Sequence, residues 1–353
     1  MPGAYSRRAL LRALGALGAV GASASLADCK GDNGFPPDSG SAASPTSGPG
    51  SGGLLAAQAS SSGAGSASPS PLTRTVHAAT GTVQVPATPQ RVVVLGTAEL
   101  DSALSLGFTP VGAARPQFDH GLPDYFPSGW LTHVARVGVV GAPDLATVKR
   151  LRPDVILSSR SVDGARYQQL SAVAPTVLTD STGASWKQDF QLHAQALNAQ
   201  SFADAVTSAY QDHTREVTAE LGGSGATRRQ QISVVRFVQG QDPSVVAARS
   251  YLGVLLADVQ LGRPAAQNAQ TDAVAVATTD KLDAMDGTTI FYSTYGDPAK
   301  AHTDEVLNSD AWKNLSAVKA GRAYAVDDEL WNQGVGYFGA DLILAQLRRY
   351  LGG

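Results

Sequence analysis

Several features common in chains of this length are scarce or missing from these 353 residues. Cys29 is the only cysteine, which excludes an intrachain disulfide framework and any metal site built from several cysteines. The six histidines are scattered, with no two at ligand spacing on one helix, which argues against a zinc site. Lysine and arginine number 27 against 30 acidic residues, so the chain lacks the basic excess of a nucleic-acid-binding protein.

Motifs of catalytic chemistry are missing too. Gly223-Ser224-Gly225 lacks the strand–turn–helix context of a nucleophile elbow. Gly334-Val335-Gly336 precedes a helix start and does not open the βαβ unit of a dinucleotide fingerprint, and there is no phosphate loop. The Asp327-Asp328-Glu329 run is interpreted as a solvated turn rather than a cation site. We therefore expect a binding protein that is not an enzyme and holds no cofactor or metal of its own.

The first 28 residues have the pattern of an export signal. Ser6-Arg7-Arg8 is a twin-arginine start, and residues 13–27 form a stretch of small and apolar residues that is too short for a good membrane span. Leu26-Ala27-Asp28-Cys29 resembles a bacterial lipobox, although Asp28 stands where a small residue is usual. We expect twin-arginine export and a lipid anchor on Cys29. Ordinary cleavage nearby, leaving a free thiol, is the alternative.

Composition divides the rest of the chain into a tether and two lobes. Residues 29–72 are dominated by serine, glycine, alanine and proline and cannot bury enough apolar surface to fold, so we expect a disordered tether. We expect an N-terminal α/β lobe over residues 73–186, a linking helical region over 187–222 and a C-terminal α/β lobe over 223–353.

The first lobe opens with a β-α-β unit around which the other elements are arranged. Val92–Leu95 is an apolar run typical of a strand buried on both faces. A helix over Ala98–Leu106, capped by Thr97 and ended by Gly107, leads to a second strand at Val111–Ala114. Such strands are parallel neighbours, and a parallel sheet binds its ligand beyond the carboxyl ends of its strands.

Further strands and helices alternate along both lobes. We predict strands at 155–157, 176–178, 232–238, 273–276, 289–292 and 323–326, and helices at 145–151, 167–173, 251–259, 280–285, 303–308 and 340–351. Lys187–Leu221 is predicted to be helical throughout, with a cap at Ser201 and apolar residues at three-to-four spacing after it. The predicted fold class is α/β, with two Rossmann-like lobes joined by a single long helix and a ligand cleft between them.

Several pieces of the chain, in order, resemble the iron-siderophore-binding lipoproteins of ABC importers. These proteins form a helix-linked class of periplasmic binding proteins that includes ferrichrome, ferrioxamine and vitamin B12 binders. The pieces lie between Pro89 and Leu351 and read RVVVLG, TAELDSALSLGFTPVG, GAPDLATVKRLRPDVIL, LSAVAPTV and LSAVKAGRAYAVDDELWNQGVGYFGADLILAQLRRYL. The resemblance implies capture of a ferric siderophore for an ABC permease in the membrane, without metal ligands from the protein.

Candidate ligand-binding residues are aromatic side chains and arginines at strand ends or in loops. Rings supply rigid contact area, and guanidinium groups donate hydrogen bonds to chelate oxygens. Arg236 interrupts the apolar strand 234–238 and matches the ligand-binding arginine of the family, while Trp331 lies in a polar segment. The predicted set is Trp331, Arg236, Arg160, Tyr337, Tyr251, Tyr295 and Trp186. Core packing is the alternative for each ring, and a structural ion pair is the alternative for each arginine.

The resemblance also implies docking to the permease through one surface glutamate in each lobe. In the first lobe Ala146 replaces this glutamate, and in the second lobe the shorter Asp280 stands in its place. Asp144 is a further docking candidate, with helix capping as its alternative role. The change at Ala146 leaves open whether coupling to a transporter survives.

We expect a monomeric, lipid-anchored extracytoplasmic protein that captures a ferric siderophore and hands it to an ABC permease. A hydroxamate chelate is favoured because the surface is mildly acidic and the expected cleft holds few arginines. Two alternatives stay open: a haem or tetrapyrrole binder, and an envelope interaction protein that kept the fold but lost transport coupling.

Overall fold

The computed structural model describes residues 72–276 and 282–352. The predicted signal peptide, the tether up to residue 71, Cys29 and the docking candidate Asp280 lie outside these residues. The described chain begins with a hairpin of β1 (Thr73–Ala78) and β2 (Gly81–Pro86). None of the described helices is both long enough and apolar enough to cross a membrane.

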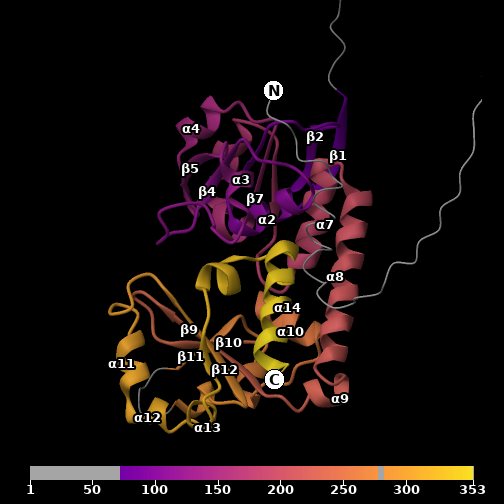
Figure 1. Cartoon of the computed structure of the whole chain (residues 1–353). Coiled ribbons are helices and arrows are strands. Elements are labelled where there is room, and N and C mark those ends of the chain that lie inside the picture. Colours follow the sequence, from indigo (N-terminus) through magenta and orange to yellow (C-terminus); the bar gives the residue numbers. More distant parts are fainter. Residues whose placement is uncertain (1–71, 277–281, 353) are drawn as a thin grey trace, which may run out of the picture. The chain divides into compact units, whose positions relative to one another are not determined.

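A six-stranded sheet forms the first lobe (Figure 1). Its order is β6-β5-β4-β3-β7-β8, and only β6 runs antiparallel to its neighbour. The predicted β-α-β unit is present, since Val93 and Val94 pair in parallel with Gly112 and Ala113. The strands are β3 (Val92–Val94), β4 (Gly112–Arg115), β5 (Ala135–Val139), β6 (Ala142–Pro143), β7 (Val155–Ser159) and β8 (Thr176–Thr179). The helices are α2 (Thr97–Ser105), α3 (Ser128–Leu131), α4 (Leu145–Arg150), α5 (Arg160–Asp163), η1 (Gly164–Arg166) and α6 (Tyr167–Ser171).

A five-stranded sheet forms the second lobe, in the order β11-β10-β9-β12-β13. β9, β12 and β13 are parallel, whereas β10, which the sequence did not predict, runs antiparallel to both of its neighbours. The strands are β9 (Ile232–Val238), β10 (Ser244–Val246), β11 (Ala273–Ala275), β12 (Thr289–Tyr295) and β13 (Ala323–Ala325). The helices are α9 (Ser224–Thr227), α10 (Tyr251–Asp258), η2 (Ala265–Asn268), η3 (Leu282–Met285), α11 (Thr303–Asn308), α12 (Asp310–Lys313), α13 (Ser316–Lys319), η4 (Glu329–Gln333) and α14 (Tyr337–Leu351).

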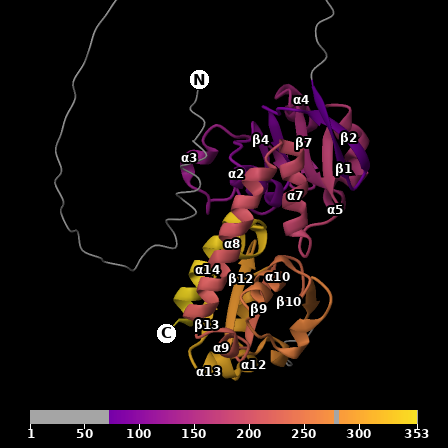
Figure 2. The same ribbon diagram turned by 90° about the vertical axis from the view of Figure 1, so that its right-hand side faces the viewer.

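The segment between the two lobes forms two helices, of which the second and longer one links the lobes. The prediction of an uninterrupted helix over 187–221 is wrong, because α7 (Trp186–Leu197) ends at Asn198, which has the left-handed φ of 57°. Asparagine tolerates this conformation, which turns the chain before α8 (Gln200–Glu220). Ser201 is therefore inside α8 and does not cap it. The 21-residue α8 is the long rod that passes along both sheets (Figures 1 and 2).

The start of α2 also differs from the prediction. Gly96, and not Thr97, is the N-cap residue, and no side chain caps this helix end. Gly107 follows the C-cap residue Leu106 and has a left-handed φ of 80°, so the helix ends at this glycine as predicted. Residues 98–105 of this helix are all buried, including the acidic residues Glu99 and Asp101.

Asp101 connects α2 of the first lobe to α14 at the end of the chain. Its carboxylate accepts hydrogen bonds from the backbone N–H groups of Phe338 (3.1 Å) and Gly339 (2.9 Å). These N–H groups lie in the first turn of α14, where the helix dipole favours a negative charge. The carboxylate approaches so closely that a Cβ on Gly336 would lie 2.2 Å from its Cγ atom.

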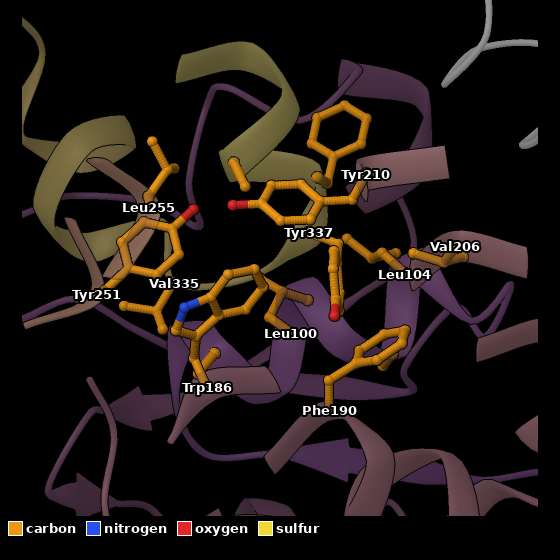
Figure 3. Close-up of a cluster of buried hydrophobic side chains, with 14 of the residues drawn as sticks. Leu100, Leu104, Trp186, Phe190, Val206, Tyr210, Tyr251, Leu255, Val335 and Tyr337 are labelled. Atoms are coloured by element: carbon orange, nitrogen blue, oxygen red, sulfur yellow. The ribbon is translucent and has the colours of Figure 1, made fainter. Parts of the chain in front are cut away.

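An aromatic cluster joins the two lobes in one continuous core (Figure 3). The ring of Tyr337 lies 4.7 Å from Trp186, 4.6 Å from Phe190 and 5.2 Å from Tyr210, measured between centroids. Tyr251 of α10 packs against Trp186 at 5.3 Å. These rings come from α7, α8, α10 and α14, so the buried surface passes from one sheet to the other without a break.

Candidate functional site

The parallel strands of the second lobe all end at the same edge of their sheet. β9 ends with Arg236-Phe237-Val238, β12 ends with Ser293-Thr294-Tyr295, and β13 is followed by Asp327 and Asp328. Because carboxyl ends of parallel strands meet at one edge, residues more than ninety positions apart come together there. Two hollows lie at this edge.

The first, which we name the Arg236 hollow, has a volume of about 260 Å³. Thr182 and Gly183, from the segment between β8 and α7, contribute one part of its wall. The second lobe contributes the rest: Arg236, Val238, Gln241, Ser244, Val246, Ser250, Tyr251, Leu252, Asp272, Ala273, Trp331, Asn332 and Val335. The hollow therefore lies between segments of both lobes.

The second, which we name the acidic hollow, has a volume of about 430 Å³. Phe118, Asp119 and His120, from the loop after β4, face the second lobe across it. The second lobe supplies Gln239, Thr294, Tyr295, Gly296, Asp297, Asp327, Asp328 and Glu329. Five of the described residues that line it carry a carboxylate. No lysine or arginine is found among these described lining residues.

An ion pair joins Arg236, which lines the Arg236 hollow, to Asp328, which lines the acidic hollow. The guanidinium Nε and Nη2 atoms donate to the two carboxylate oxygens at 2.9 and 2.8 Å, which is the bidentate geometry that arginine favours. Asp328 is buried, and its Oδ1 atom also accepts from Ser293 at 2.8 Å and from Asn332 at 3.1 Å. The guanidinium lies 5.4 Å from the ring centroid of Tyr295. These contacts fix the position of the only lysine or arginine among the described residues that line either hollow.

Burial and crowding of the carboxylates raise their pKa values. Desolvation, together with the neighbouring Asp124 and Asp119, raises the pKa of Glu329 to about 8, although its Oε2 atom accepts from the backbone N–H of Asp124 at 2.8 Å. Burial, and after it nearby acids, also raises the pKa of Asp119 and of Asp327. One oxygen each of Asp124, Asp327 and Glu329 lies within 4.8 Å of the other two. These carboxylates are therefore close enough that a negative charge on one disfavours ionisation of the others.

Four of the predicted ligand-binding residues reach the hollows. Arg236, Tyr251 and Trp331 border the Arg236 hollow, and Tyr295 borders the acidic hollow. Tyr295 lies at the end of strand β12 and not in a loop as expected, and its hydroxyl accepts from the Phe118 N–H at 3.1 Å. Trp331 lies in the π-helical turn η4 with no exposed surface, and its indole N–H donates to Gln346 at 2.7 Å.

The other three predicted residues lie away from the two hollows. Trp186 and Tyr337 are almost fully buried in the aromatic cluster (Figure 3). Arg160 is half exposed and forms an ion pair with Asp180 beside α7, where a separate surface groove lies. The structure therefore places these residues in packing and in an ion pair, the alternative roles considered from the sequence.

Asp144 acts as the N-cap of α4. Its carboxylate accepts from the Thr147 hydroxyl at 2.5 Å and from the N–H groups of Thr147 at 3.2 Å and Ala146 at 3.0 Å, and these bonds lower its pKa. It is thus already engaged in the capping role considered as an alternative, while the second docking candidate, Asp280, lies outside the described residues.

Sequence reasoning missed the residues that give this edge its charge. Asp328 was assigned to a solvated turn. The proline- and aromatic-containing loop 115–130 is long enough to form the rim of a pocket, but Phe118 and Asp119 within it were not singled out. The one available signal was Arg236 itself, because a charge inside an apolar strand requires a partner or a cleft. Nothing local to either segment pairs Arg236 with Asp328.

Comparisons with known proteins place the chain in a family. Residues 92–330 match the model of the periplasmic binding protein family. The probable siderophore-binding lipoprotein YfiY of Bacillus subtilis is 32% identical over 289 residues, covering 79% of this chain and 87% of that protein. The Fe(3+)-citrate-binding protein YfmC of the same organism is 29% identical over 265 residues, covering 74% and 80%.

Solved structures agree with this assignment. Staphylococcus aureus SirA complexed with staphyloferrin B superposes with a TM-score of 0.71 at 28% identity, covering 79% of this chain and 98% of that chain. Bacillus subtilis FeuA complexed with ferri-bacillibactin, at 20% identity and a TM-score of 0.66, supports the fold alone. The predicted two-lobe α/β fold class is confirmed, and the chain belongs to the periplasmic binding protein family.

Proposed function

We propose that this chain is an extracytoplasmic solute-binding protein that captures a ferric siderophore for an ABC importer and catalyses no reaction. The observation that carries the proposal is the pair of hollows at the sheet edge, lined by segments of both lobes, with Arg236 and Tyr295 between them. Volumes of about 260 and 430 Å³ are together in the range of small-molecule sites. Relatives named for siderophore and ferric citrate binding support the iron-chelate class.

A hydroxamate siderophore is the proposed ligand class. A trihydroxamate neutralises Fe³⁺ with three hydroxamate anions, so its ferric centre carries no net charge and does not need several arginines around it. The described lining of the two hollows offers one arginine together with the rings of Tyr295 and Phe118. Ring faces and single hydrogen-bond donors suit such a ligand.

Export by the twin-arginine route, a lipid anchor on Cys29 and a monomeric state belong to the same proposal. A short lipid anchor followed by a tether of about forty residues lets a globular binding protein reach its permease while staying at the membrane. Growth with a radiolabelled lipid precursor tests the anchor: the wild type becomes labelled, and a Cys29→Ala variant does not.

A steric variant with a matched control tests the binding proposal. Ala273 is exposed on the edge strand β11 and lines the Arg236 hollow, while Ala275, two residues along the same strand, is equally exposed and does not line it. Tryptophan fluorescence titrated with ferric hydroxamates, ferric catecholates, ferric citrate and haem gives the affinities. We expect Ala273→Trp to weaken binding of the preferred iron chelate at least tenfold by filling the hollow, and Ala275→Trp to leave it unchanged.

The same titration decides against the alternatives. Binding of haem without binding of any iron chelate would assign the chain to tetrapyrrole capture, and no quenching by any ligand would remove the proposal.

Loss of transport coupling is a second candidate, favoured by one observation. Ala146 stands where a docking glutamate is expected, and the neighbouring Asp144 is engaged in capping α4. If coupling is weak, Ala146→Glu raises uptake of the iron chelate in cells while the affinity of the purified protein stays the same. Equal uptake by wild type and variant, both above a deletion strain, would show that coupling does not depend on this position.

A further inference from the structure

Acidic side chains outnumber basic ones in the acidic hollow of the candidate site. The acidic hollow is lined by Asp119, Asp297, Asp327, Asp328 and Glu329, with His120 as its one basic side chain. Asp119 has a buried carboxylate oxygen with no hydrogen-bond partner among the described residues. With Glu329 protonated at neutral pH and Asp328 paired with Arg236, the lining carboxylates that remain are those of Asp119, Asp297 and Asp327. A ligand that enters it meets a negative potential.

Cationic side chains near this space offset only part of that potential. Lys300 lies 3.9 Å from Asp297, and the charge of Arg115 opposes the rise in the pKa of Asp119. Arg236 is held by both oxygens of Asp328, so the pair carries no net charge and only its remaining N–H groups are available to a ligand. Arg115, at the end of β4, donates through Nη1 to the backbone carbonyls of Pro116 at 3.0 Å and Gln117 at 3.2 Å, and to that of Asp119. Both guanidinium groups are therefore positioned by the protein itself.

Aromatic rings complete a setting suited to a cation. Phe118 and Tyr295 line the acidic hollow with their ring centroids 4.8 Å apart, and ring faces attract cationic groups. An ammonium group placed here would lie beside rings and carboxylates, which is the combination that stabilises a partly desolvated cation. An anionic chelate would instead be repelled by the carboxylates, because Arg236, which is the only arginine among the described residues that line either hollow, already pairs with Asp328.

We propose that Asp328, by neutralising Arg236, and the acidic hollow together act as a charge filter that selects ferric chelates carrying a cationic group over anionic ones. This inference rests on the proposed function and narrows it to a substrate class, ferric trihydroxamates with a free ammonium tail. The iron-bearing part of such a ligand would occupy the Arg236 hollow, and its tail would extend into the acidic hollow.

A pair of ligands that differ in one charge tests the filter directly. Ferrioxamine B carries a free ammonium tail, and its N-acetylated form keeps the same ferric centre without that charge. A unit charge several ångströms from a carboxylate at the dielectric of a protein surface changes affinity by about tenfold. We expect the wild type to bind ferrioxamine B about tenfold more tightly than the acetylated form, and the ratio to shrink in high salt. Equal affinities, or a preference for a ferric tris-catecholate, would overturn the filter.

Two sets of variants locate the filter. Asp297→Asn with Asp327→Asn removes charge from exposed rim positions without touching the buried ion pair, and is expected to bring the affinity ratio close to one. Asp204→Asn with Glu216→Gln on the exposed face of α8 changes the net charge equally and should leave the ratio at its wild-type value. A ratio that falls equally in both would reduce the effect to overall charge and contradict the proposal.

Asp328→Asn tests the buried residue itself. It frees Arg236 from its counter-ion, and we expect affinity for ferric citrate to rise at least tenfold relative to ferrioxamine B. If this variant fails to fold, the rim variants still decide the question. Failure of the filter is distinguishable from failure of the proposed function, because in the first case iron chelates bind with the wrong charge preference and in the second case none binds.

Discussion

At the scale of single residues, the buried environment of His193 disfavours its protonated form. It is fully buried in α7, and neither ring nitrogen has a hydrogen-bond partner among the described residues. Burial lowers its pKa to about 3 from an ordinary value of 6.5. Between about pH 6.5 and pH 3, His193 is therefore protonated in the unfolded chain and neutral in the folded chain.

This difference in proton binding predicts a loss of stability in mild acid. The free energy of unfolding should fall as the pH drops from about 6.5 towards 3, with this one residue contributing up to about 1.4 kcal/mol per pH unit. Urea unfolding of His193→Leu at several pH values should show a shallower decline than the wild type. His133→Leu, at an exposed position, is the control. Parallel curves for wild type and His193→Leu would contradict the assignment.

Glu329 predicts a pH dependence of ligand binding. Its pKa of about 8 means that it is mostly protonated at pH 7 and becomes an anion as the pH rises towards 9. The groups that face it are Asp124, Asp119 and His120 from the first lobe, and Asp327 and Asp328 beside it. If a cationic tail enters the acidic hollow, affinity for ferrioxamine B should rise several-fold over this interval.

Titration calorimetry provides the check on Glu329. Binding of the cationic ligand at pH 7.5 should release protons, which is seen as a dependence of the measured heat on the ionisation enthalpy of the buffer. Glu329→Gln should abolish both this release and the rise in affinity with pH. The N-acetylated ligand should show neither effect even with the wild type. A rise of equal size for both ligands would assign the pH dependence to other groups.

At the scale of elements, the contact between α2 and α14 depends on a single carboxylate. Asp101→Ala removes the acceptor for two buried N–H groups, and we expect it to lower the free energy of unfolding by about 2–4 kcal/mol. Gly336→Ala should have a comparable effect, because its Cβ would overlap the Asp101 carboxylate. Ser105→Ala, which removes only the 3.1 Å hydroxyl contact to Asp101, should cost less than either. Denaturant unfolding monitored by circular dichroism gives the comparison.

The elements that could be predicted are those whose signals are local. β9 over Ile232–Val238 and α11 over Thr303–Asn308 agree with the prediction to the residue, because an apolar run and an amphipathic segment carry their own pattern. Tyr295 was assigned to a loop because the polar Ser293 and Thr294 hide the end of β12. Trp331 was predicted to bind the ligand because its neighbours in sequence are polar, yet the π-helical turn directs its ring into the core, with its centroid 4.7 Å from that of Phe291.

The site could be predicted only in part, for a related reason. Arg236 was identified because it breaks a local pattern. Its partner Asp328 lies 92 residues away, and the acidic hollow is assembled from four separate segments that no periodicity relates. The prediction that residues 187–221 form one uninterrupted helix failed at Asn198, whose left-handed backbone divides α7 from α8. Long-range pairing and single-residue turns are thus the two kinds of information that local patterns leave out.

At the scale of the whole described molecule, the lobes are joined by packing as well as by the chain. The aromatic cluster around Tyr337 includes rings from helices on both sides, and the Tyr251 hydroxyl donates to the Gly336 carbonyl at 2.9 Å. A close-packed joint of this kind resists large rotation, because interiors have few voids into which rings can move. We therefore expect ligand capture to involve only small movements of one lobe against the other.

The shared core predicts that the two lobes unfold together. Separate cores would give separate thermal transitions, whereas a continuous one makes the folded state of each sheet depend on the other. Calorimetry of the wild type should give a single transition with equal calorimetric and van't Hoff enthalpies.

Tyr337→Ala removes the ring at the centre of the cluster, and we expect it to lower the free energy of unfolding by about 3–5 kcal/mol and to split the transition in two. Tyr324→Ala, a half-buried ring at the far edge of the second sheet, is the matched control and should lower the melting temperature without splitting the transition. Two transitions already present in the wild type would show that the joint does not couple the lobes, and larger closing movements on binding would then be expected.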